Sequence, residues 1–139
     1  MKTVMDQHEI NQLGSSLQKI DQTLIRSDQS SGVTRLWYQG REPYFDVVFE
    51  LQNHDLVWFQ LTLRGKSLSW NQKSKNVQTG MTNERQVNDT TYYSGSKLIQ
   101  TNHTVDQNFV QLVRAILQTR VGELVFDQAL ALLNQRTQS

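Results

Sequence analysis

The sequence contains no cysteine and only one proline among its 139 residues. Without cysteine, the chain has no disulfide framework, no thiol nucleophile and no thiolate ligand for a metal ion. Charged residues make up only 19% of the chain, which argues against the highly charged class of disordered proteins. No apolar run approaches the roughly 18 residues that a membrane span requires. These absences leave a small globular domain as the expectation.

The N-terminal sequence MKTVMDQHEI becomes polar too early for a secretory signal peptide. We therefore expect a cytoplasmic protein without a membrane partner. The length suits one folding unit, and neither an internal repeat nor a linker divides the chain. We predict that residues 1–139 form a single domain.

The first predicted element is an amphipathic helix. Five apolar residues recur at alternating steps of three and four: Ile10, Leu13, Leu17, Ile20 and Leu24. That spacing is typical of a helix with one buried face. Asp6 is placed to cap the first turn, and the helix is expected to end near Arg26, before a loop. Gly14 costs about 1 kcal/mol relative to alanine inside a helix, so either packing offsets that cost or another element approaches the backbone closely there.

The middle of the chain alternates as antiparallel strands with one buried face do. We predict strands at residues 33–38, 44–51 and 56–64. The odd-numbered residues of the last two strands form one apolar face: Phe45, Val47, Phe49, Leu51, Val57, Phe59, Leu61 and Leu63. The odd-numbered residues of both strands lie on the same face only if odd-numbered residues pair with each other across the hairpin. The two residue numbers of each cross-strand pair must then sum to an even value, such as 106 or 108. The connection then has three or five residues, or the hairpin contains a bulge.

The stretch LTLRGKSLSW, residues 61–70, contains the last three residues of a phosphate-binding loop motif, Gly65-Lys66-Ser67. The glycine that the motif requires five positions earlier is replaced by Gln60, and no helix signal follows the serine. A nucleotide site is therefore rejected. Since Leu68 and Trp70 are even-numbered but apolar, we predict a β-bulge at the glycine, a residue that accepts positive φ.

The last part of the chain predicts a short strand at residues 77–81, a final strand at 90–100, and two helices. The first helix follows a capping motif at residues 104–107, and the second runs from about Leu124 to Gln135. The fold class is therefore α+β. We expect an N-terminal helix, a four- to five-stranded antiparallel sheet, and two C-terminal helices packed on one sheet face.

No motif in the sequence marks a catalytic or metal site. The three histidines, His8, His54 and His103, lack the spacing of a helical metal site. No serine lies in a G-x-S-x-G elbow. Tyr93 and Lys97 have the spacing of a dehydrogenase pair, but the chain lacks the glycine-rich turn and βαβ pattern of a dinucleotide site. We expect no catalytic residue, no metal and no cofactor.

The even-numbered face of the central hairpin is the candidate interaction face. Its residues combine aromatic side chains with charges of both signs: Tyr44, Asp46, Glu50, Trp58, Gln60 and Arg64. Trp, Tyr and Arg supply most of the hot spots of protein interfaces. With a pairing sum of 108, Glu50 lies opposite Trp58. The alternatives are an ordinary solvated sheet face and a face half covered by a helix.

Three functions remain open. The favoured one is a non-catalytic binding or assembly module that acts through protein–protein contacts, including self-association as a homo-oligomer. The second is binding of single-stranded nucleic acid, since residues 60–100 carry six basic and two acidic groups. That function would use stacking aromatics and basic side chains: Trp37, Trp58, Tyr92, Arg64, Lys66, Lys73 and Lys75. The third is a small enzyme or ligand-binding pocket between sheet and helix that uses Asp46, Glu50 and Arg64.

Overall fold

A computed structural model of the chain describes residues 6–20, 32–82, 99–101 and 104–137. These residues contain three helices: α1 (Gln7–Ser16), α2 (Gln107–Gln118) and α3 (Leu124–Thr137). They also contain the strands β1 (Gln18–Lys19), β2 (Val33–Gln39), β3 (Asp46–Gln52), β4 (Asp55–Leu63), β5 (Lys66–Asn71), β6 (Asn76–Thr82) and β7 (Ile99–Thr101).

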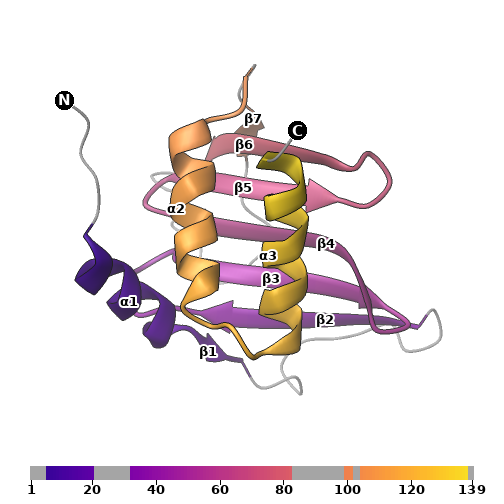
Figure 1. The fold of residues 1–139 in the computed structure, drawn as a ribbon, viewed down its shortest axis with the longest axis horizontal. Coiled ribbons are helices and arrows are strands. Elements are labelled where there is room, and N and C mark those ends of the chain that lie inside the picture. Colours follow the sequence, from indigo (N-terminus) through magenta and orange to yellow (C-terminus); the bar gives the residue numbers. More distant parts are fainter. Residues whose placement is uncertain (1–5, 21–31, 83–98, 102–103, 138–139) are drawn as a thin grey trace.

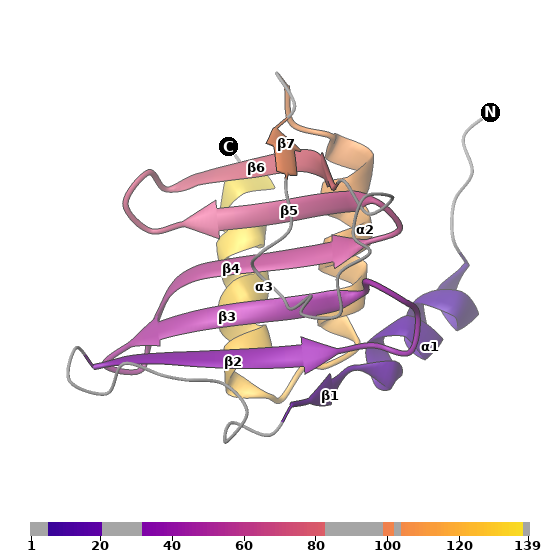
Figure 2. The ribbon, with the colours of Figure 1, turned by 180° about the vertical axis from the view of Figure 1, so that it is seen from behind.

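The strands form one antiparallel sheet in which every strand pairs with its neighbours in sequence, from β1 to β7. Helices α2 and α3 lie side by side on one face, and α1 lies beside the end of the sheet near β1 (Figure 1). Figure 2 shows the opposite face, across which none of the described helices runs. The α+β class and the two helices on one face are confirmed. The expected four or five strands were too few, because six strands of three or more residues are joined by the two-residue β1.

The hairpin of β3 and β4 has the predicted register. Glu50 pairs with Trp58, so the paired numbers sum to 108, and the register then shifts between Glu50 and Leu51. The shift is a bulge that lets a two-residue turn, Asn53-His54, close the hairpin. Both turn residues have positive φ, 52° and 74°, as in the tight turns whose twist matches that of the strands.

The predicted bulge at Gly65 is wrong, because the chain reverses there. Leu63 pairs with Lys66, and the two residues between them, Arg64 and Gly65, have φ of 51° and 82°. A two-residue turn makes the paired numbers odd in sum, so the even-numbered Trp70 meets Phe59 on the apolar face. A turn therefore explains the change of parity as well as a bulge does, and the glycine is used for its positive φ in both cases.

Helix α1 begins as predicted and ends earlier than expected. Asp6 accepts a hydrogen bond from the backbone N–H of Glu9 at 2.8 Å. The helix ends at Ser16 rather than near Arg26, because the chain becomes extended at Leu17 and joins the sheet. The N–H of Ile20, for example, donates to the carbonyl oxygen of Trp37 at 2.8 Å. Predicted helix residues 21–26 lie outside the described residues.

The two C-terminal helices are confirmed with one change of cap. The N-cap of α2 is Asp106, whose carboxylate accepts from the N–H of Phe109 at 3.1 Å. That bond, together with a contact to Lys66, lowers the pKa of Asp106 below its usual range. The short strand predicted at residues 77–81 is confirmed as β6, whereas most of the strand predicted at 90–100 lies outside the described residues. No helix in the described segments is long and apolar enough to span a membrane.

The core lies between the sheet and the helices. Phe49 of β3 and Tyr38 of β2 both pack edge-on against Phe126 of α3, with ring centroids 5.1 and 4.9 Å apart. Phe59 stacks with Trp70 at 6.3 Å, which extends the aromatic layer from β4 to β5. Burial of these rings fixes α3 over the centre of the sheet and leaves the strand ends beyond α3 without a helix above them (Figure 1).

Candidate binding site

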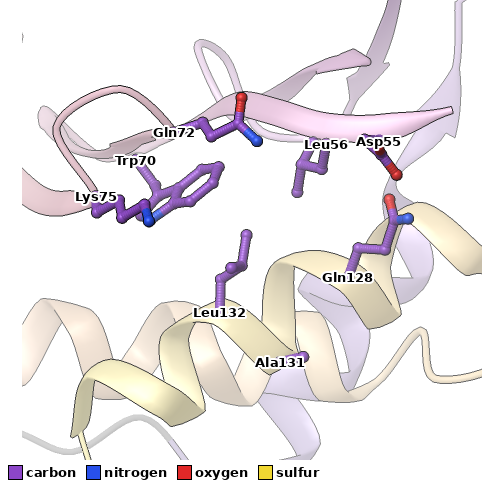
Figure 3. A pocket seen from close by; sticks show the side chains of 8 residues that line it. All are labelled: Asp55, Leu56, Trp70, Gln72, Lys75, Gln128, Ala131 and Leu132. Carbon is purple, nitrogen blue, oxygen red and sulfur yellow. The ribbon is translucent and has the colours of Figure 1, made fainter. Parts of the chain in front are cut away.

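A pocket lies where the sheet extends past α3 (Figure 3). Its volume is about 530 Å³, and its lining residues come from the start of β4, the end of β5, the β5–β6 turn and α3: Asp55, Leu56, Trp70, Gln72, Lys75, Gln128, Ala131 and Leu132. Sites for small ligands and side chains are commonly concave, apolar and of about 300–1,000 Å³. The pocket therefore has the size of a binding site.

The walls of the pocket follow from local sequence and pairing. The bulge in β4 turns Leu56 to the helix-facing side, and the pairing of Trp70 with Phe59 places the indole on the same side. From below, α3 contributes Gln128, Ala131 and Leu132, which lie on one face because they are three and four residues apart. The result is an apolar gap between two layers.

The rim of the pocket is polar and carries both signs of charge. Asp55 and Lys75 are exposed and lie at opposite sides of the opening in Figure 3. Gln128 donates a hydrogen bond of 3.5 Å from Nε2 to the carbonyl oxygen of His54, while its buried Oε1 has no hydrogen-bond partner in the described part of the chain. An apolar floor with such a rim can hold an apolar side chain while the rim contacts the polar atoms around it.

The residues expected to form an interaction face have different surroundings. Asp46 and Gln60 are only 2% and 8% exposed. Asp46 accepts a hydrogen bond of 2.6 Å from the hydroxyl of Thr62, a neighbour across the sheet. The expectation that these two side chains stand on an exposed face is therefore wrong. These parts of the face are shielded from solvent, although none of the described helices covers them, so the alternative of a covering helix is not confirmed.

Glu50, Trp58 and Tyr44 are half-buried. Glu50 accepts from Arg35 of β2 at 2.6 Å and lies opposite Trp58, which confirms the predicted neighbourhood of charge and aromatic ring. The partner Arg35 was not identified from the sequence. Arg35 of β2 lies directly opposite Glu50 of β3, so these opposite charges on the sheet face neutralise each other within the chain.

Arg64 lies in the β4–β5 turn, away from the row that contains Trp58. Its guanidinium contacts Glu42 at 2.6 Å and Glu9 of α1 at 3.2 Å. The hydrogen bond from Arg64 lowers the pKa of Glu42, and the same bond raises the pKa of the guanidinium above its usual range. Arg64 thus ties the turn to the β2–β3 loop and to α1.

The proposed enzyme set does not converge. Asp46 bonds with Thr62, Glu50 with Arg35 and Arg64 with Glu42, and none of the three lines the pocket. Among the described residues, no group of three or more histidine, aspartate or glutamate side chains is arranged to hold a metal ion. The pocket between sheet and helix exists, but its lining residues are others.

The residues considered for nucleic-acid binding are distributed over the molecule. Arg64 and Lys66 lie at one end of β5, where Lys66 contacts Asp106 at 3.3 Å, and Lys73 and Lys75 lie beyond the other end. Six residues of a strand span roughly 20 Å. Tyr92 lies outside the described residues, so these positions do not define one site.

The pocket residues were not recognised as a set from the sequence. The sequence of α3 contained one indication of the pocket, since it has more apolar residues than one buried helical face needs. These residues are Leu124, Val125, Phe126, Ala129, Leu130, Ala131, Leu132 and Leu133. Such a surplus indicates contact with something in addition to the core. The strands that complete the pocket depend on register, which this surplus does not reveal.

Comparisons with known proteins add no identity to this geometry. No protein-family model matches the chain, and neither the curated proteins nor the solved structures contain a match.

Proposed function

We propose that the protein is a non-catalytic binding module that holds an apolar side chain of a protein partner in the pocket beside α3. The observation that supports this most is the apolar gap of about 530 Å³ between Leu56 and Trp70 of the sheet and Leu132 of α3. Burial of one leucine-sized side chain contributes roughly 1.5–3 kcal/mol. The pocket therefore supplies an anchor, and the rim supplies orientation.

The rim favours a peptide over a purely apolar ligand. Asp55 and Lys75 can pair with charged groups on either side of an anchoring residue, and Gln72 can hydrogen-bond to its main chain. We favour the pocket over the outer sheet face as the working surface, because burial of Asp46 and Gln60 removes two of the candidate side chains from contact with a partner.

The test is selection of peptides from a displayed random library on the full chain, followed by titration of a selected peptide. Ala131→Arg puts a long charged side chain at the opening of the pocket, and Ala131 is exposed, so the fold should tolerate it. We expect peptide affinity to fall by about tenfold or more. Gln118→Arg, an exposed position on α2 away from the pocket, is the matched control and should bind as the wild type does.

A second readout locates the peptide. The chain has three tryptophans, so replacing Trp37 and Trp58 by phenylalanine leaves Trp70 as the single emitter. Peptide binding should change its emission, because the indole forms a wall of the pocket. The proposal fails if no peptide is selected, or if selected peptides bind equally well to the Ala131→Arg variant.

A further inference from the structure

Helix α3 carries apolar surface that the core does not use. Val125, Phe126, Ala129 and Leu133 are buried and account for one face of the helix. Leu124, in contrast, is 70% exposed, the largest exposure among the exposed large hydrophobic residues of the described segments. Ala131 is exposed as well, two turns farther along the same side. The outward side of the helix therefore has an apolar side chain at its start and the pocket at its end.

The spacing of these features is self-complementary. Leu124 and Leu132 are eight residues apart, which corresponds to about 12 Å along a helix. Gln128 lies midway between them. If two copies of α3 pack antiparallel about a two-fold axis at Gln128, Leu124 of each copy faces Leu132 and the pocket of the other.

The groups beside Leu124 permit such a contact. The carboxylate of Asp127 accepts from the N–H of Gly122 at 3.1 and 3.3 Å, and Glu123 is paired with Arg120. The stripe itself, Leu124, Gln128 and Ala131, is uncharged. The stripe therefore places no charge of its own at the contact, and Ala131 is small enough to allow close packing of the helices.

Gln128 suits the position on the axis. A residue on a two-fold axis meets its own copy, and a glutamine amide both donates and accepts hydrogen bonds. Among the described residues, its Oε1 has no hydrogen-bond partner, and its Nε2 has only the 3.5 Å contact with His54. Rotation of the amide toward a second copy would give both atoms a partner.

We infer that the chain forms a two-fold dimer in which α3 packs antiparallel against its copy and Leu124 of each protomer occupies the pocket of the other. This rests on the proposed function, since it uses the same pocket, and it names the partner as a second copy of this chain. The side chain that the pocket holds is then a leucine presented by a helix.

Sedimentation equilibrium of the full chain over a range of concentrations is the first test, because a dimer must dissociate on dilution. Leu124→Lys should weaken dimerisation by about tenfold or more, since it places a charge in an apolar pocket. Met81→Lys is the matched control, as Met81 is a 54% exposed apolar residue of β6 outside the stripe. It should dimerise as the wild type does. A monomeric wild type, or a Leu124→Lys variant that dimerises normally, would overturn the inference.

Oxidative cross-linking tests the position of the axis. The chain has no cysteine, so Gln128→Cys introduces a single thiol per protomer. A two-fold axis at this residue brings the two thiols together, and a covalent dimer should form rapidly, since a disulfide requires Cβ atoms about 4 Å apart. Met81→Cys should remain uncross-linked under the same conditions. Cross-linking at Met81 instead of Gln128 would refute this geometry.

The peptide titrations separate this inference from the proposed function. Leu124→Lys changes the residue that enters the pocket and leaves the pocket intact, so it should still bind selected peptides. Ala131→Arg blocks the pocket and should lose both peptide binding and dimerisation. Peptide binding by a strictly monomeric chain would overturn the dimer alone.

Discussion

The layer of helices meets the sheet at two corners that differ in how they are completed. At the closed corner, α1, the α2–α3 turn and β2 meet around Arg120. At the open corner, the sheet runs past α3 and the pocket remains between them. The closed corner is completed by one guanidinium and one glycine, whereas the open corner has apolar walls and, among the described residues, a single long hydrogen bond of 3.5 Å from Gln128 to the carbonyl oxygen of His54. The comparison separates residues that hold the fold together from residues available for a partner.

Arg120 links three parts of the closed corner. Its Nη1 donates to the carbonyl oxygens of Gly14 and Leu17 at 2.9 and 2.8 Å, which satisfies acceptors at the end of α1. The guanidinium contacts both carboxylate oxygens of Glu123 and lies 5.0 Å from the ring centroid of Phe126. These interactions are charge-assisted and largely screened from water, since the side chain is only 18% exposed.

The largest expected effect on stability is at this residue. Arg120→Ala removes the donor to the carbonyl of Leu17 and the carboxylate of Glu123, and leaves the carbonyl of Gly14 with only its 3.3 Å bond from the N–H of Leu17, so the free energy of unfolding should fall by about 2–4 kcal/mol. Arg120→Lys keeps the charge but lacks the planar guanidinium group, so its loss of unfolding free energy should be smaller than that of Arg120→Ala but still measurable. Urea denaturation measures the change. Arg41→Ala, at an exposed position, should stay within about 0.5 kcal/mol of wild type. An equally small effect at Arg120 would show that the corner closes without it.

Gly14 tests the close approach of α1 to the end of α2. A Cβ added there would lie 1.8 Å from Oγ1 and 2.8 Å from Cβ of Thr119. Although alanine gains about 1 kcal/mol of helix propensity, Gly14→Ala should destabilise the protein by about 1–3 kcal/mol through overpacking. A double-mutant cycle with Thr119→Gly should recover most of that cost. A more stable Gly14→Ala variant would contradict the contact.

Tyr38 gives the closed corner a dependence on alkaline pH. Burial raises the pKa of Tyr38, with a further contribution from Glu123 that Arg120 opposes. Because the folded-state pKa is the higher one, the unfolded state loses its proton first, and this contribution to stability declines as the pH rises above about 10. Tyr38→Phe should reduce the alkaline decline in the unfolding free energy. The half-buried Tyr44 provides the control substitution Tyr44→Phe, which should retain the decline. Parallel pH profiles for all three chains would refute this.

The smallest effect on stability is expected at the open corner. Ala131→Arg adds an exposed side chain of good helix propensity and should change the unfolding free energy by less than about 0.5 kcal/mol. The same variant should lose peptide binding, so function and stability are separable there. A large loss of stability would instead indicate that the pocket mouth is part of the packed core.

The alternation of apolar and polar residues predicted much of the register of the β3–β4 hairpin. Alternating residues required an even pairing sum, and the pairing of Glu50 with Trp58 follows it. The same reasoning misplaced the next connection, because a two-residue turn at Arg64 and Gly65 changes parity as a bulge does. Local pattern specifies which side chains are inside, but not whether the strand continues or reverses.

Glycine shows a similar limit. The sequence predicted that Gly14 must be offset by packing or approached by another element, and Thr119 is that element. The identity of the neighbour was not predictable, since it lies 105 positions later in the chain. The interaction face was predicted from alternation alone, and burial of Asp46 and Gln60 could not be read from a pattern that describes only two strands.

The sequence by itself determined the α+β class, the cap at Asp6 and the inward face of the central strands, because these depend on spacing and on contacts between near neighbours. Only the tertiary structure decided which carbonyl groups Arg120 contacts and where the strands extend beyond α3. Both features depend on where α3 lies on strands that are distant from it in sequence. The packing of Phe126 against Tyr38 and Phe49 fixes that position. The pocket is the space that this packing leaves.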